Sequence, residues 1–223
     1  MLDLESFGNG SQIIDLSTGK EISKKTLTLE DIQTCFSTIQ KYNLHIHAYT
    51  DQGIITTNPL YMDLRNSILF PGKIKFDIVD SVLEYIQKEN PVIMKLIISS
   101  PNELAEVKNS LEKSTNLNIT HIVKKGIYKD NIIDKEYEYL DIAPINVTKG
   151  NALQVLIDYL KLSKEDILSI GDNINDIDMF KVSGIGAVIN NACDEVKKFG
   201  SYITLNSAEN GGFAEAIYKF IPF

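Results

Sequence analysis

The stretch that decides the fold is residues 167–176, which read ILSIGDNIND. Its first four residues form a short apolar run that ends at Gly171, a pattern typical of a buried strand. Acidic and amide residues follow at once, beginning with Asp172. In a parallel sheet, ligands gather beyond the carboxyl ends of the strands. The pattern therefore places Asp172 where a binding site would be built.

Short helices and strands alternate on both sides of this stretch. Thr148 is a residue type that caps helices, and Pro144 ends the segment before it. Regular alternation of this kind predicts crossover units on a parallel sheet, hence an α/β fold. The predicted elements are helix 150–160, strand 166–170, helix 175–181, strand 185–189, helix 194–199, strand 202–205 and helix 212–220.

The preceding part of the chain gives a mixed pattern of helices and strands. Thr28 stands three residues before Asp31, a variant capping box that predicts a helix start. A strand is expected before it, and two strand–helix units and a last strand after it. The predicted elements are strand 11–16, a helix after Thr28, strand 44–49, helix 77–87, strand 92–98, helix 102–112 and strand 119–123.

The composition excludes several classes of protein. The chain has 223 residues, a formal net charge of -8 and no block rich in Lys and Arg, which argues against a nucleic-acid or anionic-membrane partner. It has no run of eighteen apolar residues and no signal-like start, so we expect a cytoplasmic protein. Cys35 and Cys193 suggest neither a disulfide framework nor a zinc site.

Asp172 and Asp176 are candidates for holding a hard cation. Carboxylate oxygens suit Mg²⁺, and the two residues lie one helical turn apart. A structural interpretation is also open at this point: Asp172 can cap the next helix, and Asp176 can complement its dipole.

Lys149 is a candidate for binding an anion. A lysine in the first turn of a helix opposes the positive end of the helix dipole, a cost of roughly 0.3 to 1 kcal/mol. A phosphate bound between Lys149 and the helix start would turn this cost into a favourable interaction, because its oxygens accept hydrogen bonds from the backbone N–H groups and from the ammonium. An exposed lysine without a role is the alternative.

Several segments together resemble the Cof-type phosphatases of the haloacid dehalogenase superfamily. The resemblance covers nearly the whole chain, and the spacing between the segments agrees with the third and fourth motifs of that family. The segments are 9–11 (NGS) with 13–15 (IID), 146–153 (NVTKGNAL), 171–180 (GDNINDIDMF), 183–192 (SGIGAVINNA) and 208–213 (AENGGF).

The resemblance implies a role for each candidate residue. Lys149 would neutralise the nucleophile and the substrate phosphate, Asp172 would bind Mg²⁺ directly, and Asn175 would contact phosphate. Asp176 would not bind the metal directly; it would orient metal-bound water or the lysine. The implied reaction is the hydrolysis of small phosphorylated metabolites.

The resemblance also implies the domain organisation. Residues 1–20 and 144–223 would form a Rossmann-like core with a parallel sheet, and residues 21–143 an inserted α+β cap that determines the substrate.

The family's first motif, Asp-x-Asp-Gly-Thr, is not present before residues 9–11, and neither is its second motif. Asp3 begins a weak echo of the first motif, with too few residues before it for a buried strand. We therefore expect an N-terminally incomplete, truncated core that is not competent alone, because no carboxylate nucleophile is present. Apolar faces left uncovered would favour self-association or a complementing N-terminal segment.

Two other functions and one other metal site are alternatives to the phosphatase interpretation. The first is a catalytically inactive remnant that acts as a binding or interaction module. The second is a response-regulator receiver domain, which also uses acidic strand ends and a lysine, but in the reverse order. His45 and His47 share one face of a predicted strand and are weak candidates for metal ligands, because no third ligand lies nearby in the sequence.

Overall fold

The computed structural model describes residues 4–58, 75–100, 102–125 and 136–222. The chain divides into two compact units. One combines residues Met1–Ser23 with Asn146–Phe223, and the other spans Lys24–Ile145. The sequence placed its boundaries after residues 20 and 143, and the assignment of the two parts as core and cap stays a prediction.

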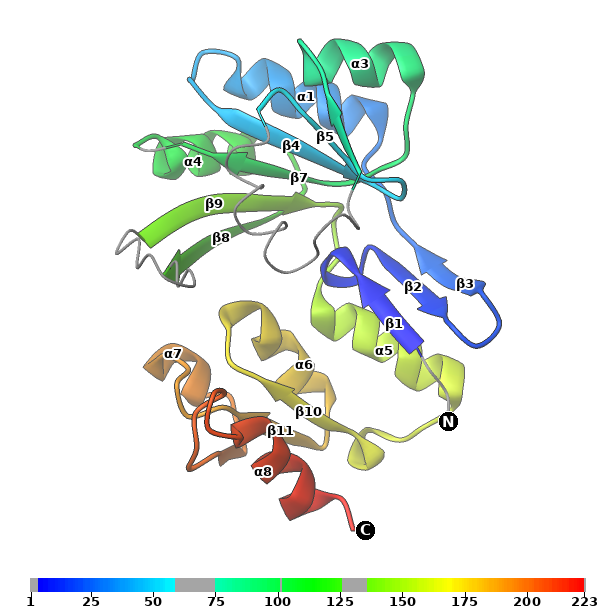
Figure 1. Cartoon of the computed structure of the whole chain (residues 1–223), viewed down its shortest axis with the longest axis vertical. Coiled ribbons are helices and arrows are strands. Elements are labelled where there is room, and N and C mark those ends of the chain that lie inside the picture. Colours follow the sequence, from blue (N-terminus) through cyan, green and yellow to red (C-terminus); the bar gives the residue numbers. More distant parts are fainter. Residues whose placement is uncertain (1–3, 59–74, 101, 126–135, 223) are drawn as a thin grey trace. The chain divides into compact units, whose positions relative to one another are not determined.

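In its described residues, the continuous unit is a six-stranded sheet with three helices (Figure 1). The strand order is β6-β5-β4-β7-β9-β8, and the pairs are antiparallel except for β5 with β6. The strands are β4 (His45–Thr50), β5 (Ile54–Thr56), β6 (Phe76–Ile78), β7 (Ile93–Ser99), β8 (Asn118–Lys125) and β9 (Glu136–Ala143); the helices are α1 (Leu29–Ile39), α3 (Val82–Glu89) and α4 (Leu104–Ser114).

The three helices cover a single face of that sheet. Cys35 of α1, Ile86 of α3 and Val107 of α4 all belong to the cluster that buries the alternate strand residues Ala48 and Leu96. Side chains alternate between the two faces of a strand, so the residues between these core positions lie on the opposite face.

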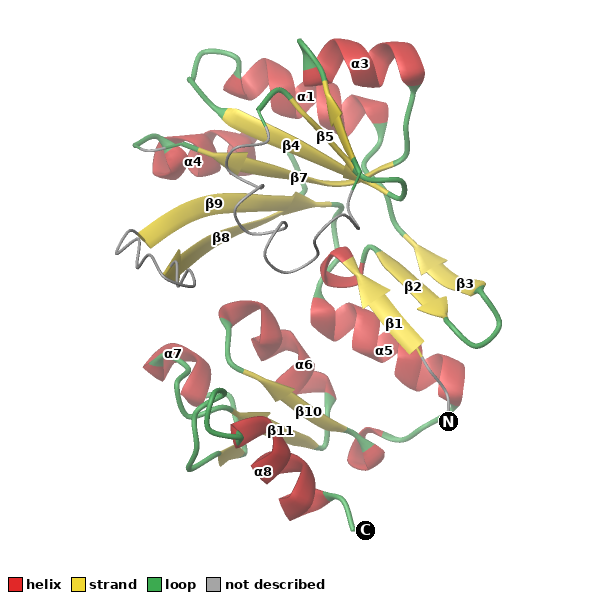
Figure 2. Ribbon diagram, in the orientation of Figure 1, coloured by secondary structure: helices red, strands yellow, loops and turns green. Residues whose placement is uncertain are grey.

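The discontinuous unit contains a small sheet in the order β1-β2-β3 and a parallel sheet in the order β10-β11-β12. Figure 2 shows both sheets with their helices. The strands are β1 (Leu4–Phe7), β2 (Gln12–Asp15), β3 (Lys20–Lys24), β10 (Leu168–Gly171), β11 (Ile185–Val188) and β12 (Tyr202–Ile203); the helices are α5 (Lys149–Leu160), α6 (Ile177–Val182), α7 (Asp194–Lys197) and α8 (Gly212–Phe220). The predicted parallel sheet after residue 165 is therefore confirmed.

Capping residues explain why several helices begin where they do. Thr28 accepts a hydrogen bond from the Asp31 backbone and closes the predicted capping box, and Thr148 caps α5 through the Asn151 backbone. One prediction was wrong: the helix expected from residue 77 begins at Val82. Ser81 caps this helix, and the preceding residues pair with β5 instead.

The short strands β1, β3, β5 and β6 were not predicted from the sequence. β5 and β6 have three residues each, too few to show an alternating pattern. β1 occupies part of the segment in which the Asp3 echo was noted, and Asp3 itself lies outside the described residues. In the part of the chain described here, no helix has the length and apolar character needed to cross a membrane.

Candidate functional site

The predicted site residues come together at the carboxyl end of β10. The chain leaves β10 at Gly171 and enters a single 3-10 turn (Ile174–Asp176) that leads directly into α6. Asn173 and Asp176 form a capping box across this turn. The turn holds Asp176 almost fully buried, while Asp172 remains exposed.

Asp176 is the centre of the hydrogen-bond network. Its Oδ2 accepts the backbone N–H groups of Asp172 and Asn173, at 3.0 Å each. Its Oδ1 lies 2.5 Å from the Nζ of Lys149. Both carboxylate oxygens are therefore occupied by protein donors, as a nearly buried charge requires.

Gly171 allows this close approach. A Cβ atom at Gly171 would lie 2.5 Å from the Cβ of Asp176 and 2.7 Å from its Oδ2, well inside contact distance. A side chain at this position would push the carboxylate away from the N–H groups that it accepts. The glycine that ends the strand in the sequence pattern thus also makes room for the buried acid.

Lys149 is held by Asp176 rather than exposed at the helix start. The ion pair joins α5 to the turn before α6, and the Lys149 side chain is about one-third exposed, with a relative exposure of 34%. A lysine at the start of a helix needs an anion to offset its unfavourable position, and for Lys149 this anion is a carboxylate of the chain itself. The helix dipole alone therefore gives no support to a bound phosphate.

Asn175 reaches residues near the start of the chain. Its Nδ2 donates to the Oδ1 of Asn9 at 3.3 Å, and its buried Oδ1 has no hydrogen-bond partner among the described residues. Asn9 has a left-handed backbone, with φ of 58°. Beside it, Gly10 approaches α5 so closely that a Cβ would lie 2.8 Å from the Thr148 carbonyl oxygen. Asn9 was not predicted as a site residue, although its segment carried part of the family resemblance.

The two candidate metal residues, Asp172 and Asp176, differ in how far their carboxylates are engaged by the protein. Among the described residues, the Asp172 carboxylate makes no hydrogen bond or ion pair, whereas both oxygens of Asp176 are engaged. No group of three or more His, Cys, Asp or Glu residues in the described ranges could hold a metal ion. Mg²⁺ keeps several waters and uses one or two carboxylates together with substrate phosphate, so a single open carboxylate fits a hydrated ion.

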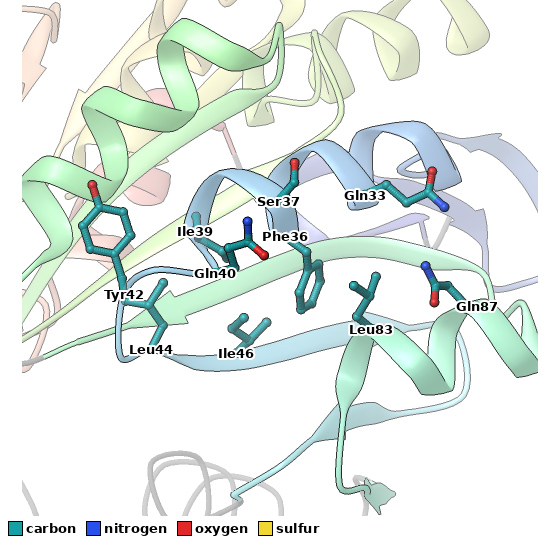
Figure 3. A pocket seen from close by; sticks show the side chains of 10 residues that line it. All are labelled: Gln33, Phe36, Ser37, Ile39, Gln40, Tyr42, Leu44, Ile46, Leu83 and Gln87. Carbon is teal, nitrogen blue, oxygen red and sulfur yellow. The ribbon is translucent and has the colours of Figure 1, made fainter.

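A cavity of about 400 Å³ lies elsewhere, in the six-stranded unit, and contains none of the predicted site residues (Figure 3). Its floor is apolar, and three glutamines stand around it. It is lined by Gln33, Phe36, Ser37, Ile39, Gln40, Tyr42, Leu44, Ile46, Leu83 and Gln87.

Comparison with known proteins matches residues 4–217 to the model of the haloacid dehalogenase-like hydrolases. A candidate phosphatase of Streptococcus pyogenes serotype M6 is 30% identical over 216 residues, which is 96% of this chain and 74% of that protein. A haloacid dehalogenase-like hydrolase from Bacillus subtilis has a TM-score of 0.77 at 19% identity, covering 100% of this chain and 80% of that one. The subclass IIB sugar phosphatase BT4131 has a TM-score of 0.71 at 17% identity, covering 95% and 73%.

Proposed function

Because the chain belongs to the haloacid dehalogenase-like hydrolases, we propose that it is a magnesium-dependent phosphatase of the Cof type, acting on small phosphorylated metabolites. The observation that supports this best is the arrangement at the end of β10. One open carboxylate, that of Asp172, stands beside a buried acid that holds the Lys149 ammonium in place.

Each residue has a distinct task in this proposal. Asp172 would hold the hydrated ion, which when bound neutralises charge on the phosphoryl oxygens. Lys149 supplies a second positive charge toward the same phosphate. Asp176 fixes the ammonium of Lys149 and the backbone at Asp172, so it positions these groups without touching the substrate.

The proposed phosphate contact of Asn175 depends on its amide. Its N–H₂ group already donates to Asn9, and its carbonyl oxygen, an acceptor, has no partner in the part of the chain that the structure describes. A phosphate oxygen also accepts, so contact requires the amide to donate its second N–H. The Asn9–Asn175 bond would then orient the amide for that role.

The sequence printed for this chain contains no recognisable segment that carries the attacking carboxylate. No Asp-x-Asp-Gly-Thr segment occurs in it. The lack of this segment favours one alternative function. The chain would be a binding module that uses the same Lys149 and Asp172 to hold a phosphorylated ligand without hydrolysing it.

Turnover of a panel of phosphomonoesters, including sugar phosphates and an aryl phosphate, separates the two functions. The proposed phosphatase predicts magnesium-dependent release of phosphate that falls at least a hundredfold in Lys149→Met and Asp172→Asn. The binding module predicts release no faster in the unmodified chain than in these variants. Lys181→Met is the matched control, because Lys181 pairs with Asp178 on the exposed surface of α6.

A further inference from the structure

The cavity on the helix-covered side of the six-stranded sheet is bounded by two helices and a strand (Figure 3). α1 and α3 supply its walls, and Ile46 of β4 belongs to its floor. Tyr42 and Leu44 stand at one end, where the chain turns from α1 into β4, and Gln33 and Gln87 stand at the other. Its volume of about 400 Å³ is that of a small-molecule site. A compact molecule therefore fits it better than a long peptide segment does.

The floor of the cavity is apolar and only partly covered. Phe36, Leu44, Ile46 and Leu83 pack against the main buried cluster of this unit, but each keeps part of its surface exposed. Removing such surface from water is favourable roughly in proportion to its area. The Phe36 ring also offers an aromatic face or edge, which favours contact with a second ring. The floor therefore selects a ligand with an apolar, preferably aromatic, body.

Charged groups do not take part in the lining. None of the 10 described residues around the cavity is charged, although 23% of the residues in the chain are. A charged ligand would lose hydration there without gaining an ion pair. The two hydroxyl groups of the lining are already engaged: Ser37 donates to the carbonyl oxygen of Thr34 at 3.0 Å, and the Tyr42 hydroxyl lies 3.2 Å from the Ser110 hydroxyl. The ligand should therefore be neutral.

Three glutamine amides are the polar groups available to such a ligand. Gln33 and Gln40 come from α1 and Gln87 from α3, and none of them bonds through its side chain to another described residue. A glutamine amide donates through its N–H₂ group and accepts through its carbonyl oxygen. A carboxamide, a lactam or the edge of a nucleobase presents a donor beside an acceptor, and so pairs with a glutamine in both directions at once.

We propose that this cavity binds a neutral aromatic or heteroaromatic ring that carries an amide-type edge. The ring would cover Phe36, Ile46 and Leu83, and the glutamines would bond to its edge. The cavity contains neither Lys149 nor Asp172, so this inference goes beyond the proposed phosphatase function and does not depend on it.

Three probes of nearly the same size and shape test the ligand chemistry. Benzamide carries the amide edge, toluene lacks hydrogen-bonding groups, and benzoate is charged. Each is titrated into the full chain without magnesium, and the methyl groups of Leu44, Ile46 and Leu83 are followed by NMR. We expect saturable shifts with benzamide in the millimolar range, as is usual for ligands of so few atoms. Toluene should bind more weakly, and benzoate most weakly.

A double variant tests the role of the glutamines. Gln40→Ala combined with Gln87→Ala should weaken benzamide binding by about fivefold or more, because two hydrogen-bonding groups are removed, and should leave toluene binding unchanged. Both glutamines are exposed, and alanine is a strong helix former, so the fold is retained. Gln52→Ala is the matched control, since Gln52 is an exposed glutamine in the turn between β4 and β5 and lies outside this cavity.

The proposal is overturned if benzamide causes no saturable shift of these methyl groups, or if the double variant binds benzamide as tightly as the unmodified chain. Benzoate binding as tight as that of benzamide would overturn the assignment of a neutral ligand, and equally tight toluene binding would overturn the pairing with the amide edge. None of these outcomes depends on phosphatase activity, since no phosphate ester is present.

Discussion

The Nζ of Lys149 lies 2.5 Å from the Oδ1 of Asp176, joining the first residue of α5 to the turn that follows β10. The other oxygen of the same carboxylate accepts two backbone N–H groups, from Asp172 and Asn173. A single buried acid thus fixes both the cation and the loop that carries the proposed metal ligand. The geometry of the site depends on Asp176 even though Asp176 is not expected to touch substrate.

We predict that Asp176→Ala destabilises the protein by about 2 to 4 kcal/mol, because it removes one ion pair and two backbone hydrogen bonds from a buried position. Denaturant unfolding measures this free energy. Asp178→Ala is the matched control: the Asp178 carboxylate pairs with Lys181 at the surface, and its loss should cost less than about 0.5 kcal/mol. Equal effects of the two substitutions would show that the network around Asp176 is not structural.

The sequence predicted the elements around this site better than the contacts within it. Thr148, the apolar run before Gly171 and the alternation after it are local signals, and the structure has α5, β10 and β11 close to the predicted positions. The pairing of Lys149 with Asp176 links residues 27 positions apart, and no local pattern encodes it. The helix dipole indicated correctly that Lys149 needs an anion, but not that the chain provides one.

The same limit applies to the first residues of the chain. Asn9 lies in a segment that resembles the family, but its contact with Asn175 involves a left-handed backbone that the sequence indicates only indirectly, through the flanking glycines. His47 was considered as a metal ligand from its spacing to His45. Its burial, and the absence of hydrogen-bond partners for its ring nitrogens among the described residues, are properties of the folded unit that no local pattern encodes.

Burial of His47 predicts a specific dependence of stability on pH. Its pKa in the folded protein is about 4, below the ordinary value of 6.5, so the unfolded chain binds the proton more readily. The part of the unfolding free energy that depends on neutral His47 should be fully present above about pH 6.5. It should be lost as the pH drops toward 4, a decrease of up to about 3 kcal/mol. Unfolding free energies of the unmodified chain and of His47→Phe, measured from pH 7 to pH 4, check this. An identical pH dependence in both proteins would contradict it.

Glu215 predicts a second pH effect, at lower pH. The hydroxyl of Tyr202 and the backbone N–H groups of Leu205 and Asn206 donate to its carboxylate and lower its pKa from 4.5 to about 2. A depressed carboxyl pKa stabilises the fold above the unfolded value, and this stability is lost as the pH falls from about 4.5 to 2. Glu215→Gln should remove this part of the acid transition, as followed by circular dichroism.

Glu209→Gln is the control for Glu215, because Glu209 is an exposed glutamate in the preceding loop. We expect its acid transition to match that of the unmodified chain. If Glu215→Gln and Glu209→Gln are indistinguishable below pH 4.5, the hydrogen bonds to Glu215 do not stabilise the folded state.

Magnesium should raise the melting temperature through Asp172. A ligand that binds only the folded state stabilises it by an amount that grows with its concentration. We predict a concentration-dependent rise with Mg²⁺ that disappears in Asp172→Asn and persists in Asp194→Asn, another exposed aspartate at the start of a helix. A rise of equal size in Asp172→Asn would remove this residue as the metal ligand.

Calorimetric titration of inorganic phosphate, with and without magnesium, tests the assignment of Lys149 and Asp172 most directly. We predict that magnesium tightens phosphate binding to the unmodified chain, that Lys149→Met weakens binding at least tenfold, and that Asp172→Asn abolishes the effect of magnesium. Lys181→Met should bind phosphate like the unmodified chain, and near-UV circular dichroism should confirm that every variant is folded. Phosphate binding that is unchanged in Lys149→Met and indifferent to magnesium would contradict the proposed site.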